Sequence, residues 1–418
     1  NTILKNVWED HKDCPMKKIL VINTLYSPHI GGGAEIICQE LSEALVKRGY
    51  HVAVLTTGNQ KGIVQDNING IAVYRSHIEN VYWHYSEDKP NKYVRMLWHL
   101  KDIYNKKMKK HIRRVMQIEK PDVVICHNIA GFSISAWDVI KEFKVPIIQV
   151  LHDQYLQCPK SNAFKDGKAC DKQCTVCFLM RLFHAKASNK VDAVVGVSQY
   201  VLNRLTKLGY FKTSKQYVIH NARRFEDIPM KESWDGKSPL KIGYIGTLSK
   251  VKGVEWLIRT FMKLDINATL IIAGKGESKE YENYLKELAS SDKRISFSGY
   301  VESIEHYWKI HLSVIPSLWP DTFPTVAFES CAYHVPVIAT TTGGLPEIIK
   351  NGVNGILCDA SNPKSLENAI KTLYENPNLL KTLAQQAKKE VLEMTFPENV
   401  INKYEAIFLK LLQRNSSR

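Results

Sequence analysis

The chain of 418 residues is 44% hydrophobic and 24% charged, with 22 glycines and 16 prolines, and these values exclude a disordered, collagen-like or coiled-coil protein. Lysine and arginine total 57 against 42 for aspartate and glutamate, so the formal net charge is +15, which either suits an acidic partner or is simply solvated. No apolar run reaches the roughly 18 residues that cross a bilayer, and the first residues lack the apolar core of a signal peptide, so we expect a cytoplasmic protein.

The first half of the chain alternates apolar strands with helical stretches. The strand in "KKILVINTLYSP" runs into the glycine loop "HIGGGAE" and a helix "IICQELSEALVKRGY", and "HVAVLTTG" is the next strand. Three further strands, "PDVVICHN" (121–128), "VPIIQVLHD" (145–153) and "VDAVVGVS" (191–198), end in polar residues. This alternation predicts an α/β domain with a parallel sheet and helices on both faces.

The pattern then restarts after a polar, aperiodic, proline-bearing stretch at 216–239. We therefore place an N-terminal domain at 1–222, a linker at 223–239 and a second α/β domain at 240–395. A final helix at 396–418 is expected to cross back to the first domain. Two facing doubly wound domains place a cleft at the carboxyl ends of both sheets.

Two carboxylates flank a proline-led helix start in the stretch "DTFPTVAFE". Pro324 fits the first helical position, where its missing N–H costs nothing. The amides of Thr325 and Val326 are then unpaired at a helix N-terminus, which favours a phosphate. Asp321 and Glu329 could accept hydrogen bonds from sugar and ribose hydroxyls, so the chemistry points to a nucleotide sugar. The alternative is that Asp321 caps the helix and Glu329 is an ordinary surface residue.

Glycine loops and lysines follow the first strand of each half. The loop "GGGAE", which contains Gly32 and Gly33, lets backbone amides approach an anion closely. It lacks the G-x-G-x-x-G spacing, and a tight turn also explains it. The segment "GTLSKVKG" offers Lys250 and Lys252 to a diphosphate, unless either is only solvated. The turn "AGKGE" suits backbone contact with a base.

These landmarks occur in the order typical of one family. The segments "GGGAE", "GTLSKVKG", "IIAGKGE" and "SFSGYV", and the run "PSLWPDTFPTVAFESCAYHVPVIATTTGGLPEIIKNGVNGIL", resemble the retaining GT-B-fold glycosyltransferases of family 4 (glycosyltransferase group 1). The long run matches the family's E-x7-E motif followed by PVIAT, GG-x-PE and NG-x-NG. The resemblance covers nearly the whole chain and implies two facing Rossmann-like domains. It also implies a nucleotide-diphosphate-sugar donor of hexose type, a saccharide or lipid-linked acceptor in cell-surface polysaccharide or glycolipid synthesis, retention of anomeric configuration, and catalysis that requires no metal or cofactor.

The resemblance implies roles for individual residues. Glu329 matches the acid that binds ribose hydroxyls, and Asp321 matches the acid near the transferred sugar, with Asp in place of Glu. Lys252 matches a diphosphate-binding lysine, whereas Thr247 stands where an arginine is expected. His127 matches a histidine that reaches the donor sugar, although a histidine at a strand end is ordinarily a polar terminator. The implied catalytic residues are thus His127, Lys252, Asp321 and Glu329, and the implied donor-binding residues are Gly32, Gly33, Thr247, Lys250, Lys252, Gly274, Gly276, Tyr300, Val301, Phe323, Pro324, Thr325, Val326 and Glu329.

The acceptor is expected at the end of a neighbouring strand. His152 and Asp153 close the strand "VPIIQVLHD", and we expect them to contact the acceptor. Asn221, in "VIHNARR", is what remains of the family's N-G-V-D motif near the linker.

Four cysteines fall in one insertion at 158–177. Cys158, Cys170, Cys174 and Cys177 could wrap a tetrahedral structural zinc, although the spacing is not that of a standard zinc finger. Disulfide pairs and free thiols are the alternatives, and the odd total of nine cysteines argues against a disulfide framework.

The stretch 91–117 is predicted to form one basic amphipathic helix with Leu97, Tyr104, Met108, Ile112 and Val115 along one side. Its apolar side could pack on the core while its lysines are solvated. Its lysine and arginine density, with the nearby "VYWHY", also fits docking on the anionic inner face of the cytoplasmic membrane to reach a lipid-linked acceptor.

Two other functions compete with a glycosyltransferase. The charge of +15 alone would fit a nucleic-acid-binding protein, but no nucleic-acid-binding module is visible, so we expect no nucleic acid partner. Thr247 and Asp321 depart from the family pattern, which leaves a sugar-nucleotide epimerase or a catalytically lapsed sugar-nucleotide-binding protein as alternatives.

Overall fold

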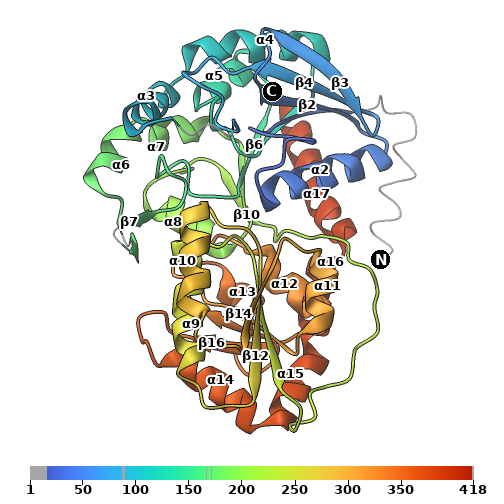
Figure 1. Cartoon of the computed structure of the whole chain (residues 1–418). Helices are drawn as coiled ribbons and strands as arrows, with labels where there is room; N and C mark the ends of the chain where they lie inside the picture. The colour runs from blue at the N-terminus through green and yellow to red at the C-terminus, as the bar shows by residue number, and fades with distance from the viewer. Residues whose placement is uncertain (1–16, 87–89, 166, 171, 417–418) are drawn as a thin grey trace, which may run out of the picture.

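A computed structural model describes residues 17–86, 90–165, 167–170 and 172–416 of the chain, and these form two α/β lobes (Figure 1). The N-terminal lobe contains an eight-stranded sheet of order β10-β9-β6-β5-β1-β2-β4-β3. Its central strands are, apart from Lys18 at the start of β1, buried and consist mostly of valine, isoleucine and leucine, as a parallel sheet covered on both faces requires. The strands are β1 Lys18–Ile22, β2 His51–Gly58, β3 Ile63–Ile68, β4 Ile71–His77, β5 Val123–Cys126, β6 Ile147–Leu151, β9 Ala193–Gly196 and β10 Lys215–Val218.

One edge of this sheet departs from the predicted parallel order. Strand β3 pairs antiparallel with β4, joined by a tight turn at Asn69 and Gly70, both of which have positive φ. The Asn-Gly pair adopts this conformation at low cost, which favours a two-residue hairpin. The other elements of the lobe are α2 Gly33–Lys47, α3 Lys92–Asp102, η1 Lys106–Met108, α4 Lys109–Glu119, α5 Ser135–Glu142, β7 Phe164–Lys165, β8 Lys168–Ala169, α6 Thr175–Met180, α7 His184–Ala187, η2 Ser188–Lys190 and α8 Gln199–Lys207.

The C-terminal lobe has a six-stranded, fully parallel sheet of order β13-β12-β11-β14-β15-β16. In chain order this is 3-2-1-4-5-6, the doubly wound arrangement whose ligands bind where the strand order reverses, here between β11 and β14. The strands are β11 Leu240–Ile245, β12 Ala268–Ala273, β13 Ile295–Gly299, β14 Leu312–Ile315, β15 Val337–Thr340 and β16 Gly355–Cys358. The helices are η3 Lys250–Lys252, α9 Val254–Met262, α10 Lys279–Ala289, α11 Ser303–Lys309, α12 Thr325–Ala332, α13 Leu345–Ile348, α14 Ser365–Glu375, α15 Pro377–Glu390, α16 Leu392–Thr395 and α17 Pro397–Ser416.

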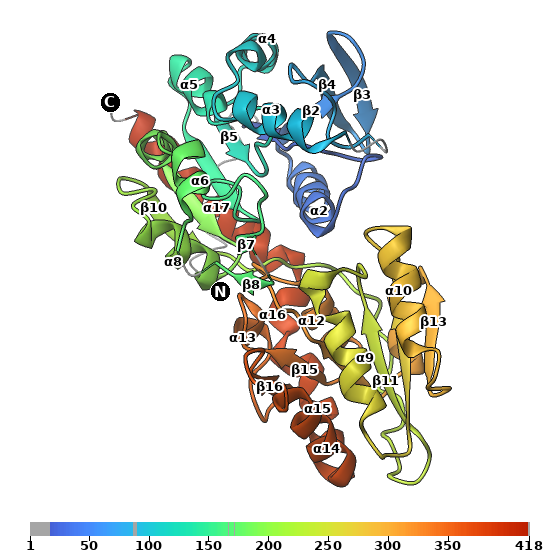
Figure 2. The same ribbon diagram turned by 60° about the vertical axis from the view of Figure 1, so that its left-hand side comes forward.

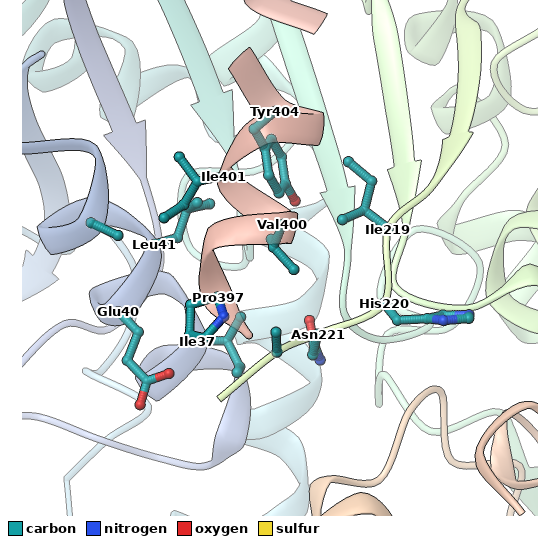
Figure 3. A pocket seen from close by; sticks show the side chains of 12 residues that line it. Ile37, Glu40, Leu41, Ile219, His220, Asn221, Pro397, Val400, Ile401 and Tyr404 are labelled. Carbon is teal, nitrogen blue, oxygen red and sulfur yellow. The ribbon is translucent and has the colours of Figure 1, made fainter. Parts of the chain in front are cut away.

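The last helix, α17, lies against α2 of the N-terminal lobe (Figures 1 and 2). The ring centroids of Tyr50 and Phe408 are 6.1 Å apart, and Arg48 Nη1 lies 3.2 Å from Glu405 Oε2. Figure 3 shows the crevice at this junction, where α2 and α17 meet the chain that leaves β10 at residues 219–222. β10 occupies the start of the stretch 216–239, so the irregular connection between the lobes begins later than the polar composition suggested.

The prediction of one helix over 91–117 is wrong. The stretch forms α3, the short turn η1 and α4, because polar side chains bind buried backbone groups at the break. Asp102 Oδ1 accepts a hydrogen bond from the amide of Gly131 at 2.7 Å, and Asn105 Nδ2 donates to the carbonyls of Glu79 and Gly131. Among the described residues, no helix is both long enough and apolar enough to cross a membrane.

Candidate active site

A cavity of about 590 Å³ lies between the lobes, at the carboxyl ends of β1, β6, β11 and β14. Its size falls in the range of small-ligand sites. Residues of both lobes line it, from the loop at Gly31 to Glu35 on one side to the segment from Asp321 to Val326 on the other. Thr322 Oγ1 donates a hydrogen bond of 2.5 Å to the carbonyl of His152, which ties the two sides together.

The glycine turn at Gly343 and Gly344 holds the loop that carries Asp321. Gly343 has φ +61°, and a Cβ atom there would lie 2.0 Å from the carbonyl oxygen of Asp321. A Cβ atom at Gly344 would lie 2.1 Å from the carbonyl oxygen of Thr322, and the Gly344 amide donates to the Asp321 carbonyl at 2.8 Å. Glycine is therefore required at both positions, because any side chain there would prevent the turn from packing against the backbone of Asp321 and Thr322.

Lys252 and Asp321 form an ion pair inside the cavity. Lys252 Nζ lies 2.5 Å from Asp321 Oδ2 and 5.0 Å from the ring centroid of Trp319. The lysine stands at the end of η3, just before Gly253, whose φ of +73° and close approach to the carbonyl of Pro316 exclude a side chain. The cavity thus holds one ammonium against one carboxylate, and an anionic ligand would compete with Asp321 for Lys252.

The start of α12 faces the cavity with unpaired amides. The helix begins at Thr325, with Pro324 as the preceding capping residue rather than the first helical one. Thr325 and Val326 line the cavity, and their amides have no partner inside the helix. Gly33 approaches from the opposite lobe, where an added Cβ would lie 3.4 Å from Thr325 Cγ2. The helix start can therefore hold an anion between the two lobes.

Glu329 lies one turn further along α12, outside the lining of the cavity. It is 4% exposed, and Arg223 of the interlobe connection lies 2.6 Å from it, measured from Nη1 to Oε1. Burial raises the pKa of Glu329, and Arg223 acts in the opposite direction. Arg223 Nε also lies 3.7 Å from Glu40 of α2, so one guanidinium joins both lobes.

His127 is buried behind His152 and does not line the cavity. Its Nδ1 lies 2.7 Å from His152 Nε2, and the stacked rings have centroids 5.0 Å apart. Burial lowers the pKa of His152 to about 4, and burial together with His152 lowers the pKa of His127 well below its ordinary value. One neutral ring therefore donates to the other at neutral pH, and His152 is the one that lines the cavity.

Asp153 and Glu35 bring two further carboxylates to the N-terminal side of the cavity. Burial raises the pKa of Asp153 to about 6, although the amide of Tyr155 donates to it at 2.8 Å. Burial also raises the pKa of Glu35, which accepts hydrogen bonds from amides of the glycine loop at Gly31 and Gly32. Glu35 was not among the predicted site residues, although an acid directly after the glycine loop "GGGAE" was the available signal.

Lys160 is a second basic side chain in the cavity wall, and sequence reasoning missed it. It belongs to the cysteine insertion, and no local pattern connects it to a cleft formed by distant strands. Within the described residues, Lys160 and Lys252 are the lysines and arginines that line the cavity. Thr247 also lines it, in the place where an arginine was expected, so the positive charge of the wall comes from Lys160 and Lys252.

Besides Glu329, five residues predicted to bind the donor lie outside this lining. Lys250 Nζ stands 6.0 Å from the ring centroid of Tyr281, and Tyr300 is 70% exposed. Gly274 supports the loop instead, since a Cβ atom there would lie 1.8 Å from the carbonyl oxygen of Gly246. The predicted donor-binding residues outside the lining, apart from Glu329, are Lys250, Gly274, Gly276, Tyr300 and Val301.

The four cysteines of the insertion lie near one another with free thiols. The Cys177 thiol is hydrogen-bonded to those of Cys158 and Cys174, and Cys170 is close enough for both of those thiols to raise its pKa, after burial. Among the described residues, no group of three or more His, Cys, Asp or Glu side chains is already spaced to hold a metal ion. The structural zinc stays a prediction.

Two facing Rossmann-like sheets, with a ligand-sized cavity between their carboxyl ends, define the GT-B class of fold. Family comparisons agree: glycosyltransferase family 4 matches residues 31–224, and glycosyl transferases group 1 matches residues 225–390. The chain belongs to the group 1 glycosyltransferases, which confirms the resemblance stated from the sequence.

Similar proteins cover most of the chain. An uncharacterized 42.6 kDa protein in the cps region of Klebsiella pneumoniae is 30% identical over 331 residues, which is 79% of this chain and 87% of that protein. N-acetyl-alpha-D-glucosaminyl L-malate synthase from Bacillus anthracis is 22% identical, over 91% of this chain and 95% of that protein. Sucrose-phosphate synthase from Thermosynechococcus elongatus has a TM-score of 0.72 at 16% identity, covering 95% of this chain and 100% of that one. Anabaena Alr3699/HepE, in complex with UDP and glucose, has a TM-score of 0.70 at 17% identity, covering 94% and 100%. These structural matches show a shared fold.

Proposed function

We propose that this glycosyltransferase moves a hexose-type sugar, with retention of configuration, from a nucleotide-diphosphate sugar to a saccharide or lipid-linked acceptor. The observation that carries the proposal is that Lys252, Asp321 and the free amides at the start of α12 share one cavity between the lobes. The UDP and glucose bound by HepE support a nucleotide-sugar donor, and the relative in a cps region supports polysaccharide synthesis.

The donor is oriented by the charges of the C-terminal lobe. The diphosphate lies between Lys252 and the amides of Thr325 and Val326, where a helix N-terminus and an ammonium both favour negative charge. The transferred sugar then lies beside Asp321, which accepts hydrogen bonds from the sugar hydroxyls once Lys252 turns toward the phosphate. The ribose lies toward Glu329, and Arg223 must share that carboxylate with the ribose hydroxyls.

Transfer proceeds by attack on the face from which the nucleotide leaves. The bond between the sugar C1 and the diphosphate oxygen breaks, and the acceptor oxygen bonds to C1 on the same face. The acceptor proton passes to the departing phosphate oxygen. Lys252 and the α12 amides stabilise the charge of that leaving group without reorganising, so no metal is required. Transfer that persists in EDTA is the expected result, and its loss on chelation with recovery on adding a divalent ion would contradict metal independence.

The acceptor binds on the N-terminal side of the cavity. Glu35, Asp153 and His152 present hydrogen-bonding groups there for hydroxyls, and Lys160 provides a positive charge. We place the reaction in the cytoplasm at the inner face of the cytoplasmic membrane, where a lipid-linked acceptor would lie.

A thermal-shift screen with UDP-, GDP- and ADP-sugars, followed by product analysis with a matched acceptor, tests the proposal. We expect one donor to stabilise the protein, and Lys252→Ala and Glu329→Ala to lose most transfer while staying folded. Wild-type turnover in either variant would contradict the proposed site. Donor binding without any transfer would assign a catalytically lapsed protein, and interconversion of the donor sugar alone would assign an epimerase.

A further inference from the structure

Helix α3 turns an apolar face toward solvent. Tyr93, Met96, Leu97 and Leu100 recur at i, i+3, i+4 and i+7, so they form one stripe, and each is about half exposed or more. Trp98 and Asp102 are the residues that the helix buries. Leu97 is therefore on the outside of the molecule, although the sequence grouped it with Met108, Ile112 and Val115, which are buried in η1 and α4.

Helix α6 and the turn after it are exposed in the same way. None of the residues of α6 is buried, and Val176, Phe178, Leu179, Leu182 and Phe183 are exposed, with Phe183 at 65%. Together, α3 and this segment carry nine of the twenty large apolar side chains that are exposed in the described part of the chain. Isolated exposed apolar residues are ordinary, but a cluster of this kind marks an interaction surface.

Both helices are anchored to Tyr155. Its hydroxyl lies 2.6 Å from the carboxylate of Asp102 at the end of α3. Arg181, which follows α6, donates from Nε to the carbonyl of Tyr155 at 3.0 Å and lies over its ring at 4.6 Å. This buried attachment ties the end of α3 and the residue after α6 to the same tyrosine, and both helices lie on the left of the N-terminal lobe in Figure 1.

Positive charge flanks the apolar stripe and continues through η1 into α4. Residues 92–118 contain nine lysines and arginines and one acid, the buried Asp102. Lys92 and Lys101 border the stripe of α3 on its two sides, as helical spacing dictates. Lys109, Lys110 and Arg113 pair with glutamates, whereas the other six make no ion pair with another described residue: Lys92, Arg95, Lys101, Lys106, Lys107 and Arg114.

We propose that the exposed faces of α3 and α6 form a docking surface for a bilayer that contains anionic phospholipid. Apolar side chains at a helix surface enter the acyl boundary, and lysines beside them contact the phosphate headgroups. A groove for a protein partner is favoured less, because Lys92 and Lys101 flank the apolar stripe and residues 92–101 contain no acidic side chain. The proposal rests on the proposed function only in naming what the surface serves, which is access to a lipid-linked acceptor.

The docking surface adjoins the acceptor side of the cavity. Arg181, Lys160 and Arg95 lie close enough to His99 of α3 to lower its pKa, after burial, and Lys160 lines the cavity. On the other side, Trp98 of α3 donates a hydrogen bond to the carbonyl of Tyr82, in the aromatic segment that precedes the helix. The hydroxyl of Tyr85, in the same segment, donates to the carbonyl of Ile30, next to the glycine loop. A lipid headgroup at this surface is therefore next to the entrance used by an acceptor.

Flotation of the full chain with vesicles tests this surface without any donor, so its failure is separable from failure of the glycosyltransferase assignment. The vesicles are phosphatidylcholine alone or phosphatidylcholine mixed with phosphatidylglycerol. We expect binding to the anionic vesicles, reduced by salt, and about a tenfold or greater loss in the double variant Leu97→Glu with Leu179→Glu. Ile118→Glu is the matched control, because Ile118 is exposed on α4 away from the stripe, and it should bind as the wild type does.

A second variant guards against loss of folding. Lys92→Glu with Lys101→Glu leaves the apolar stripe intact and should lose the preference for anionic vesicles, while thermal unfolding stays unchanged. Wild-type protein that fails to float with anionic vesicles at low salt would overturn the proposal, as would both double variants floating with anionic vesicles as well as the wild type does. A dimer that Leu97→Glu with Leu179→Glu converts to a monomer, with no vesicle binding, would assign the surface to a second copy of the chain instead.

Discussion

Arg223 Nη1 lies 2.6 Å from the carboxylate of Glu329, across 106 positions of sequence. The carboxylate is buried on α12 in the C-terminal lobe, and the guanidinium comes from the connection between the lobes. Because Arg223 also approaches Glu40 of α2, the site of the expected ribose contact is electrostatically linked to the contact between the lobes. Donor binding and closure of the lobes should therefore depend on the same arginine.

Arg223→Ala should destabilise the protein by about 1–3 kcal/mol at neutral pH, less than a fully buried pair would lose because the arginine side chain is one-third exposed. Burial raises the folded-state pKa of Glu329, so its contribution to stability is present at low pH and lost as the pH rises. Removing Arg223 raises that pKa further, so the deficit should widen between about pH 5 and about pH 8 in urea unfolding. Arg224→Ala, beside it but exposed, is the control and should show no such widening. A pH-independent deficit would contradict the coupling.

Lys252→Ala should lower transfer by roughly a hundredfold or more, because one preorganised donor to a developing anion is typically worth about 3–4 kcal/mol. Lys250→Ala is the informative comparison, since the sequence predicted it to bind the donor but the structure directs its ammonium toward Tyr281. We expect the second variant to change kcat/KM far less. Equal losses in steady-state kinetics would show that both lysines reach the diphosphate.

Gly343→Ala should destabilise the protein and reduce transfer together, because the new Cβ would meet the carbonyl oxygen of Asp321 at 2.0 Å. Gly352→Ala is a matched control: its φ of +76° imposes a similar backbone cost, but nothing lies within 4 Å of the added atom. The control should lose only about 1 kcal/mol in urea unfolding and keep its activity. If Gly343→Ala behaves like Gly352→Ala, the turn does not position Asp321.

Asp153→Asn should stabilise the protein above about pH 7, by about 1–3 kcal/mol, and have little effect below about pH 5. Burial raises the folded-state pKa of Asp153 to about 6, so the folded protein favours the protonated carboxyl. The free energy of unfolding that this group contributes is therefore lost as the pH rises through that value. Asp227→Asn should show the opposite sign, since Lys388 lowers the pKa of Asp227. Thermal unfolding across this pH range measures both, and parallel curves would contradict the burial of Asp153.

Purified protein should contain about one equivalent of zinc, because four thiols that gather in an insertion with little core of its own are suited to a tetrahedral metal. Cys174→Ser with Cys177→Ser should abolish the metal, measured by elemental analysis. Cys358→Ala, in the core of the other lobe, should leave the zinc content unchanged. Metal-free wild type would leave the cysteines as free thiols or a redox pair.

Much of the fold was predictable because its signals are local. Runs of β-branched residues, separated by helical periods, predicted the two doubly wound lobes, and the E-x7-E run with its glycine turn predicted a cleft that contains Asp321, Lys252 and Thr325. The boundaries were less accurate where side chains override periodicity. Asp102 and Asn105 bind buried backbone groups and break the helix predicted over 91–117, and no hydrophobic pattern indicates such bonds.

The sequence by itself determined which elements form and which residues come to the carboxyl ends of the strands, because both depend on the order of apolar and polar residues along the chain. Only the tertiary structure decided which of those residues meet. It placed His152 in front of His127, paired Glu329 with Arg223, brought Lys160 into the cavity wall and left Leu97 facing outward. Each of these outcomes depends on the packing of segments that lie far apart along the chain, and an ion pair or a buried ring contact forms only when the folded backbone brings the two groups within a few ångströms.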